Sequence, residues 1–115
     1  MNTAPNIPLN TDVLVILCTC PDEETAGALA GGLVEERLAA CVNILPGIRS
    51  IYRWQGETCD DAEALMVIKT AASAFEAVQD WLLEAHPYDT PEVIALPVSA
   101  GSAVYLGWVA GEVSP

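Results

Sequence analysis

The run VLVILC, residues 13–18, contains only apolar side chains and is rich in β-branched ones. Such a run is typical of a central strand buried on both faces. It is followed by PDEETAGALAGGLVEERLAA, residues 21–40, where Pro21 suits a first helical turn and the three acids after it complement the positive end of a helix dipole. The chain is therefore expected to begin with a strand and a helix of about four turns.

One apolar stripe supports the helix, formed by Ala26, Leu29, Ala30, Leu33 and Leu38. Three glycines lie within the same segment: Gly27, Gly31 and Gly32. Glycine weakens a helix interior, but it also permits close packing. The sequence leaves both interpretations open, with the sheet as the expected neighbour in the second.

A long hairpin is predicted next. CVNILPGIRSIYRW, residues 41–54, indicates a strand interrupted at Pro46 and Gly47, where proline favours a bulge or an edge position. QGE, residues 55–57, forms a short turn, and AEALMVIKT, residues 62–70, is the returning strand.

The last third predicts a helix, a strand and a short helix. Ser73 and Glu76 match the S-x-x-E capping box, and the following helix should stop at His86, since a residue before proline disfavours helical geometry. PEVIALPV, residues 91–98, predicts a fourth strand, with Pro97 favouring an edge, and residues 102–109 a short helix.

The order βαββαβ predicts an α+β, ferredoxin-like sandwich. Right-handed crossovers give an antiparallel sheet in the order 4-1-3-2, with both crossover helices on one face. We expect residues 1–11 to form a flexible tail and residues 12–115 to form a single domain.

Sixteen acidic and four basic residues give a net charge of −12. That charge repels nucleic acid and anionic lipid and attracts cations, although acidity also serves solubility alone. Neither a signal peptide nor a bilayer-spanning apolar run is recognisable, so we expect a cytoplasmic protein without disulfides. No P-loop or G-x-G-x-x-G occurs, and no catalytic function is predicted.

The predicted topology brings distant polar residues to one end of the domain. Cys18 and Cys20 end the first strand, while the only histidine, His86, lies before the fourth, near Tyr88 and Glu92. Thiol and imidazole suit copper and zinc, and copper(II) ranks highest in affinity. We expect one of the two thiols to bind, because Pro21 can break the strand alternation.

Two other interpretations of this group stay open. Cys18 can be core filling while His86 caps a helix end, where a cation is favoured. A Cys–His nucleophilic pair is the alternative, although no oxyanion hole or orienting third group is recognisable. Aromatic residues on the long hairpin, Tyr52 and Trp54, either pack on the chain's own surface or form a subunit interface, and we favour self-association.

Several segments together resemble the CutA family of divalent-cation tolerance proteins: CTCPDEETA, LVEERLAACVNILPGIRSIYRWQG, IKT, HPYDTPEV and YLGW. The resemblance covers residues 13–109. It implies a ferredoxin-like homotrimer, similar to the PII signalling proteins, in which long hairpins are shared between subunits.

The resemblance also implies copper(II) or another divalent cation as ligand, with Cys18, His86 and Glu92 at the matching positions. Ala85 stands where some relatives carry a second histidine, so a site with two imidazoles is excluded. The likeness to PII proteins suggests an alternative function, a small-molecule sensor or scaffold without catalysis. Its ligand would bind in an intersubunit cleft near Lys69, Tyr88 and Trp54.

Overall fold

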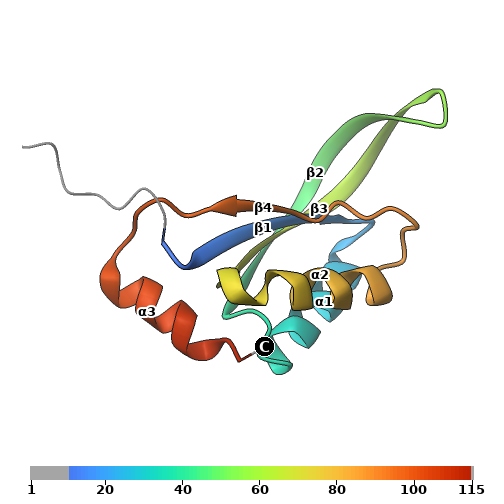
Figure 1. Cartoon of the computed structure of the whole chain (residues 1–115). Coiled ribbons are helices and arrows are strands. Elements are labelled where there is room, and N and C mark those ends of the chain that lie inside the picture. The colour runs from blue at the N-terminus through green and yellow to red at the C-terminus, as the bar shows by residue number, and fades with distance from the viewer. Residues whose placement is uncertain (1–10, 115) are drawn as a thin grey trace, which may run out of the picture.

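The computed structural model describes residues 11–114 and contains the elements in the predicted order (Figure 1). They are β1 (Val13–Cys20), α1 (Glu23–Glu35), β2 (Cys41–Trp54), β3 (Glu57–Ala71), a 3-10 turn (Ala72–Ala74), α2 (Phe75–Ala85), β4 (Ile94–Pro97) and α3 (Ala103–Glu112). The strands form one antiparallel sheet in the order β2-β3-β1-β4. This confirms the ferredoxin-like α+β fold and the predicted strand order.

Several element boundaries differ from the prediction: β4 spans Ile94–Pro97 where residues 91–98 were expected, and α3 continues to Glu112. Helix α1 starts after Asp22, whose carboxylate accepts the Thr25 N–H at 2.7 Å, so Pro21 lies outside its first turn. Strand β3 begins at Glu57, because the hairpin stays paired up to Trp54 opposite Glu57. The capping box was wrong: α2 follows a 3-10 turn, and its N-cap is Ala74 without a side-chain hydrogen bond.

All three helices lie on one side of the sheet (Figure 1). The core fills the space between them, and alternate residues of the central strands point into it. Those residues are Ile16, Cys18 and Cys20 from β1 and Ala64, Met66 and Ile68 from β3. They pack on Leu29, Leu33, Val78 and Leu82 of the helices.

The opposite face of the sheet is only partly covered. Val15 and Leu17 are half-buried there, and Ile94 and Leu96 on β4 are each 50% exposed. The prediction that the first strand is buried on both faces therefore holds on the helix side alone. The reason is that no second layer of the described chain covers this side. We call this surface the open face.

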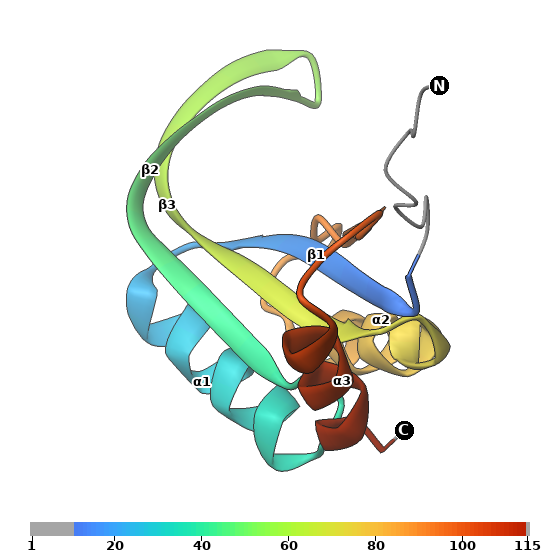
Figure 2. The ribbon, with the colours of Figure 1, turned by 90° about the vertical axis from the view of Figure 1, so that its left-hand side faces the viewer.

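The β2–β3 hairpin extends beyond the sheet and curves over the open face (Figure 2). As predicted, the ladder is irregular at Pro46 and Gly47, between Leu45 and Ile48, and Gly47 has a φ of 69°. The tip turns at Gln55 and Gly56, both with positive φ, as in the two-residue turns that match strand twist. The bulge bends the strand and so directs the hairpin over the sheet.

Gly32 provides the close approach expected of a glycine in α1, but its neighbour is α2 and not the sheet. A Cβ atom at this position would lie 2.5 Å from Cζ2 of Trp81. Added Cβ atoms at Gly27 and Gly31 would meet nothing within 4 Å. Only one of the three glycines therefore serves helix packing.

Residues 1–10 of the predicted tail and Pro115 lie outside the described residues. Thr11, the last residue of that tail, is bonded to the domain, because its N–H donates to the Val98 carbonyl at 3.0 Å. Among residues 11–114, no helix combines the length and apolar character needed to cross a membrane.

Candidate metal centre and adjoining cavity

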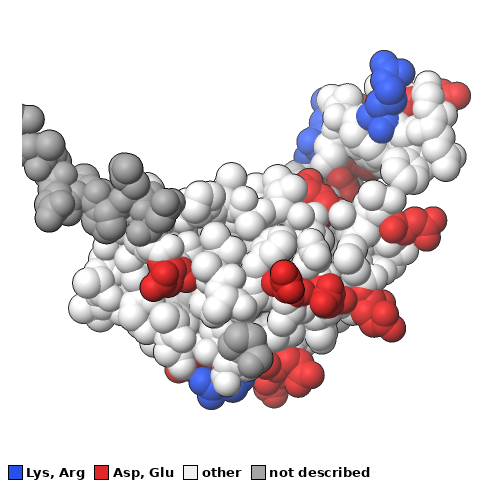
Figure 3. All heavy atoms as spheres, viewed as in Figure 1, with Lys and Arg blue, Asp and Glu red and all other residues white. Residues whose placement is uncertain are grey.

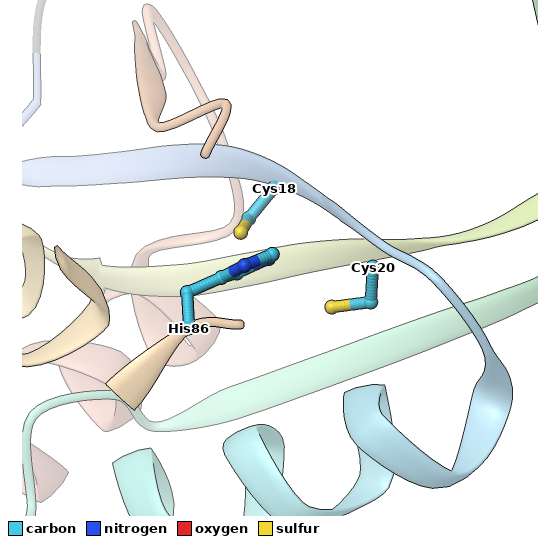
Figure 4. A group of neighbouring side chains, drawn as sticks. All are labelled: Cys18, Cys20 and His86. Carbon is cyan, nitrogen blue, oxygen red and sulfur yellow. The ribbon is translucent and has the colours of Figure 1, made fainter. Parts of the chain in front are cut away.

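Cys18, Cys20 and His86 converge beneath the sheet on its helix side. Their ligand atoms, two Sγ and one ring nitrogen, all lie within 4.8 Å of one another. Both thiols point toward the imidazole, which reaches them from the end of α2 (Figure 4). The strand alternation continues through Cys20, so both thiols lie in the cluster, whereas the sequence predicted that one of them would bind. All three side chains are buried.

Both ring nitrogens of His86 have hydrogen-bond partners. Nδ1 accepts the Tyr88 N–H at 3.1 Å, so the ring proton is on Nε2, which donates to the Thr19 carbonyl at 2.8 Å. The ring therefore joins the end of α2 to β1 and does not cap the helix carbonyls; the backbone N–H of His86 bonds to Leu82 instead. Neither nitrogen is free to act as a base toward a thiol, which removes the support for a nucleophilic pair.

The two thiols have opposite pKa shifts. The hydrogen bond to Cys20, together with burial, raises the pKa of Cys18 far above its usual range. The same hydrogen bond lowers the pKa of Cys20, although burial opposes the shift. Cys20 is therefore the thiol that loses its proton first, while the Cys18 thiol also lies 3.9 Å from the Thr19 carbonyl oxygen.

The donor set fits a soft or borderline cation such as copper or zinc. Metal–sulfur bonds of about 2.3 Å in tetrahedral geometry separate two sulfurs by about 3.8 Å, so the cluster must contract by about 1 Å at most. The two thiols can supply thiolates once Cys18 loses its proton. His86 joins them only by exchanging its hydrogen bond with Tyr88 or Thr19 for the metal.

Glu92, the third predicted ligand, lies outside this cluster. Its exposed side chain lines a cavity together with Thr19, which points to the open face because it alternates with the two cysteines. Glu92 therefore approaches β1 from the side opposite the thiols. Its negative charge still contributes to the raised pKa of Cys18.

Two adjoining cavities of about 350 and 520 Å³ lie between the hairpin and the segment that follows α2. Both are lined by Tyr52, Trp54, Tyr88 and Thr90. The larger one also contains Glu63 and Glu92. Of the predicted cleft residues, Trp54 and Tyr88 meet here, whereas Lys69 lies opposite Cys41 and Val15, toward the other end of the sheet, where it contacts Asn43.

Tyr88 belongs to both sites. Its backbone N–H bonds to His86, and its hydroxyl donates to Oε2 of Glu63 at 2.6 Å. Burial and this carboxylate raise the pKa of Tyr88 well above its usual range, so the phenol stays a donor. A single residue thus connects the thiol cluster on one side of the sheet to the cavity on the other.

Glu63 is a functional candidate that the sequence did not single out. It is only 9% exposed, and no lysine or arginine pairs with it, since the only ion pair within residues 11–114 joins Arg49 to Asp60. In the sequence, Glu63 follows the acidic hairpin residues Glu57, Asp60 and Asp61, which are exposed, so it looks like another exposed acid. Its place before the buried, alternating run of β3 was the one available signal, and only the Tyr88 contact shows its role.

The surface shown in Figure 3 carries acidic groups along the body, while basic groups gather on the hairpin and at the lower edge. Two of the four basic residues, Arg49 and Arg53, belong to β2. This distribution leaves the domain body strongly anionic, which favours cationic ligands.

The comparisons with known proteins agree on one family. The family model described as "CutA1 divalent ion tolerance protein" matches residues 14–112. The chain is 52% identical over 95 residues to the divalent-cation tolerance protein CutA of Thermus thermophilus, covering 83% of this chain and 92% of the relative. It is 50% identical over 98 residues to that of Pectobacterium atrosepticum, covering 85% and 89%. The structure of CutA from Xylella fastidiosa is similar with a TM-score of 0.88 at 45% identity, covering 90% of this chain and all of that one.

Proposed function

The chain belongs to the CutA1 divalent ion tolerance family, and on that premise we propose that it is a homotrimeric, non-catalytic protein that binds divalent cations, copper(II) above all. The convergence of Cys18, Cys20 and His86 carries this proposal. Two thiols and an imidazole within one buried cluster are the ligands that copper and zinc prefer. A cation held there would be sequestered, since burial keeps it from solvent.

The protonation of the two thiols suits such a role. Cys20 has a lowered pKa and supplies the first thiolate, and Cys18 must then release its proton. His86 would add a nitrogen donor after giving up one hydrogen bond. Glu92 would act through its charge from across the strand, in place of the direct ligation that the sequence suggested.

The open face supports the trimer. Register places Leu17 between Ile94 and Val67, and Val15 beside Leu96, so the apolar residues form one continuous surface. A sheet face of this kind is normally covered. Another copy of the chain is the expected cover, because the hairpin above this face exposes apolar groups of its own, including Ile51 at 63%.

Calorimetric titration with zinc(II) and copper(II) tests the metal proposal. Zinc cannot oxidise thiols, so it separates coordination from redox chemistry. Cys18→Ser and Cys20→Ser should each lower zinc affinity at least about tenfold. Cys41→Ser and Cys59→Ser are the matched controls, since neither residue belongs to the cluster. Equal affinity in all four variants would rule the cluster out as the binding site.

A second candidate function is a small-molecule sensor or scaffold module without catalysis. The paired cavities beside Tyr88 favour it, because they are large enough for a metabolite and combine aromatic with polar walls. This candidate predicts thermal stabilisation by a small ligand in the presence of a chelator. If metals stabilise the wild-type protein and no small molecule does, the result would argue against this candidate.

A further inference from the structure

The larger cavity contains a buried carboxyl group that forms no ion pair with the described residues. Glu63 is 9% exposed and receives one hydrogen bond, from Tyr88, on Oε2. Buried carboxylates are normally paired with a cation, because desolvation of the charge is costly. The only arginine at this cavity, Arg49, is already held by Asp60 through two hydrogen bonds of 2.8 and 2.6 Å.

The walls of the same space are aromatic. Tyr52, Trp54 and Tyr88 line both cavities, so the same three rings border the whole space. Aromatic faces attract organic cations through the ring quadrupole, and tryptophan does so most strongly. Fully hydrated metal ions gain less from such walls, because their charge is shielded by water.

Further carboxylates surround the rings. Asp89 lines the smaller cavity and Glu92 the larger one. Asp61 binds the Tyr52 hydroxyl, and this contact raises the pKa of Tyr52 to about 12. The ring is therefore kept neutral, with its oxygen directed to an anion. Apart from Arg49, the charged residues that line the two cavities are the acids Glu63, Asp89 and Glu92, so an anionic ligand would be repelled.

From this combination we propose that the cavity binds a small alkylammonium ion, whose charge meets Glu63 and Glu92 and whose methyl or methylene groups pack on Trp54, Tyr52 and Tyr88. The inference rests on the second candidate function and names its ligand class. It does not require a bound metal, because the cavity and the thiol cluster lie on opposite sides of β1, although Tyr88 contributes to both.

Choline and its uncharged carbon isostere, 3,3-dimethyl-1-butanol, provide the sharpest pair of probes. Both have the same shape, and only choline carries a charge. Calorimetric titration of the full chain in a chelating buffer, with ionic strength held constant, should show choline binding at least about tenfold more tightly. Equal binding of the two probes would overturn the proposal, as would magnesium chloride competing as well as choline at the same concentration.

Two variants with matched controls locate the site. Glu63→Gln keeps an acceptor for Tyr88 but removes the charge, and Trp54→Leu removes one ring; each should weaken choline binding about three- to thirtyfold. Glu112→Gln and Trp108→Leu, both on α3, should leave it unchanged. Trp108 is 46% exposed and Trp54 is 45% exposed, so the two tryptophans are matched in exposure.

The variants also separate this inference from the wider sensor proposal. If choline fails but another small molecule stabilises the wild type through Trp54, the sensor function stands and the ligand class is wrong. Wild-type choline affinity in Glu63→Gln would likewise overturn the assignment of the buried carboxylate. Circular dichroism and the sedimentation coefficient of each variant show whether the fold and the assembly are intact.

Discussion

Nε2 of His86 lies 2.8 Å from the carbonyl oxygen of Thr19, a contact between residues 67 positions apart in the sequence. It ties the end of α2 to β1 at the peptide between Cys18 and Cys20. The geometry of the whole cluster therefore depends on a hydrogen bond that also holds two elements of the fold together. A loss of metal binding in a His86 variant cannot be attributed to ligation alone.

His86→Ala is expected to lower the free energy of unfolding by about 2–4 kcal/mol. The change opens a cavity and leaves the Thr19 carbonyl without its partner. Urea denaturation at one fixed protein concentration measures this, since the stability of an oligomer depends on concentration. Glu84→Ala, at an exposed position of α2, serves as the control and should change stability by less than about 0.5 kcal/mol. Wild-type stability in His86→Ala would show that the contact is dispensable.

Zinc affinity is expected to rise with pH between about pH 6 and about pH 8. Below its raised pKa, Cys18 holds a proton in the free protein, and binding must displace that proton. Cys20, with its lowered pKa, contributes less to proton release as the pH rises. Titrations in buffers of different ionisation enthalpy count the protons released. An affinity that is flat or falls across this range would contradict thiolate ligation.

Two neighbouring glycines should respond oppositely to alanine. Gly31→Ala has open space and should stabilise the protein by about 0.5–1 kcal/mol through helix propensity. Gly32→Ala should destabilise it by about 1–3 kcal/mol, because the new methyl group meets the Trp81 ring at 2.5 Å. Thermal and urea unfolding measure both.

A double-mutant cycle provides the decisive control for Gly32. In a Trp81→Ala background the clash is gone, so Gly32→Ala should become neutral or stabilising. The same penalty in both backgrounds would mean that the Trp81 contact does not explain the glycine.

The open face should be sensitive to charge. Ile94→Glu is expected to dissociate the proposed trimer, whereas Leu83→Glu on α2 should not. The two residues are matched in exposure, at 50% and 52%, and differ in the side of the sheet on which they lie. Sedimentation velocity at micromolar concentration measures the outcome. An unchanged trimer in Ile94→Glu, or a wild-type monomer, would refute the assembly argument.

The predictable part of the fold came from local patterns. The apolar run at 13–18, the bulge at Pro46 and the stop at His86 each reflect constraints carried by neighbouring residues, and all three were found. Boundaries were less accurate at α1 and β3. There, a capping carboxylate and a pairing partner on another strand decide where the element starts, and neither is visible in periodicity.

The candidate site was likewise predictable only in part. Cys18 and His86 could be brought together by topology alone, because the order of elements places both at one end of the sheet. The participation of Cys20 and the exclusion of Glu92 from the cluster could not be predicted. Both depend on the face of β1 that each side chain approaches. From the sequence, Pro21 left it uncertain whether Cys18 and Cys20 point to the same face.

The sequence by itself determined the order of the elements, the family and the acidic charge, since each follows from residue types and their spacing. Only the tertiary structure decided on which side of the sheet each polar group lies. Strand pairing sends the thiols and His86 to the helix side and places Glu63 beneath Tyr88 on the open side. The physical reason is that a buried environment is created by chain segments distant in sequence, so a carboxyl group or a thiol becomes buried beside its partners only after these segments have packed.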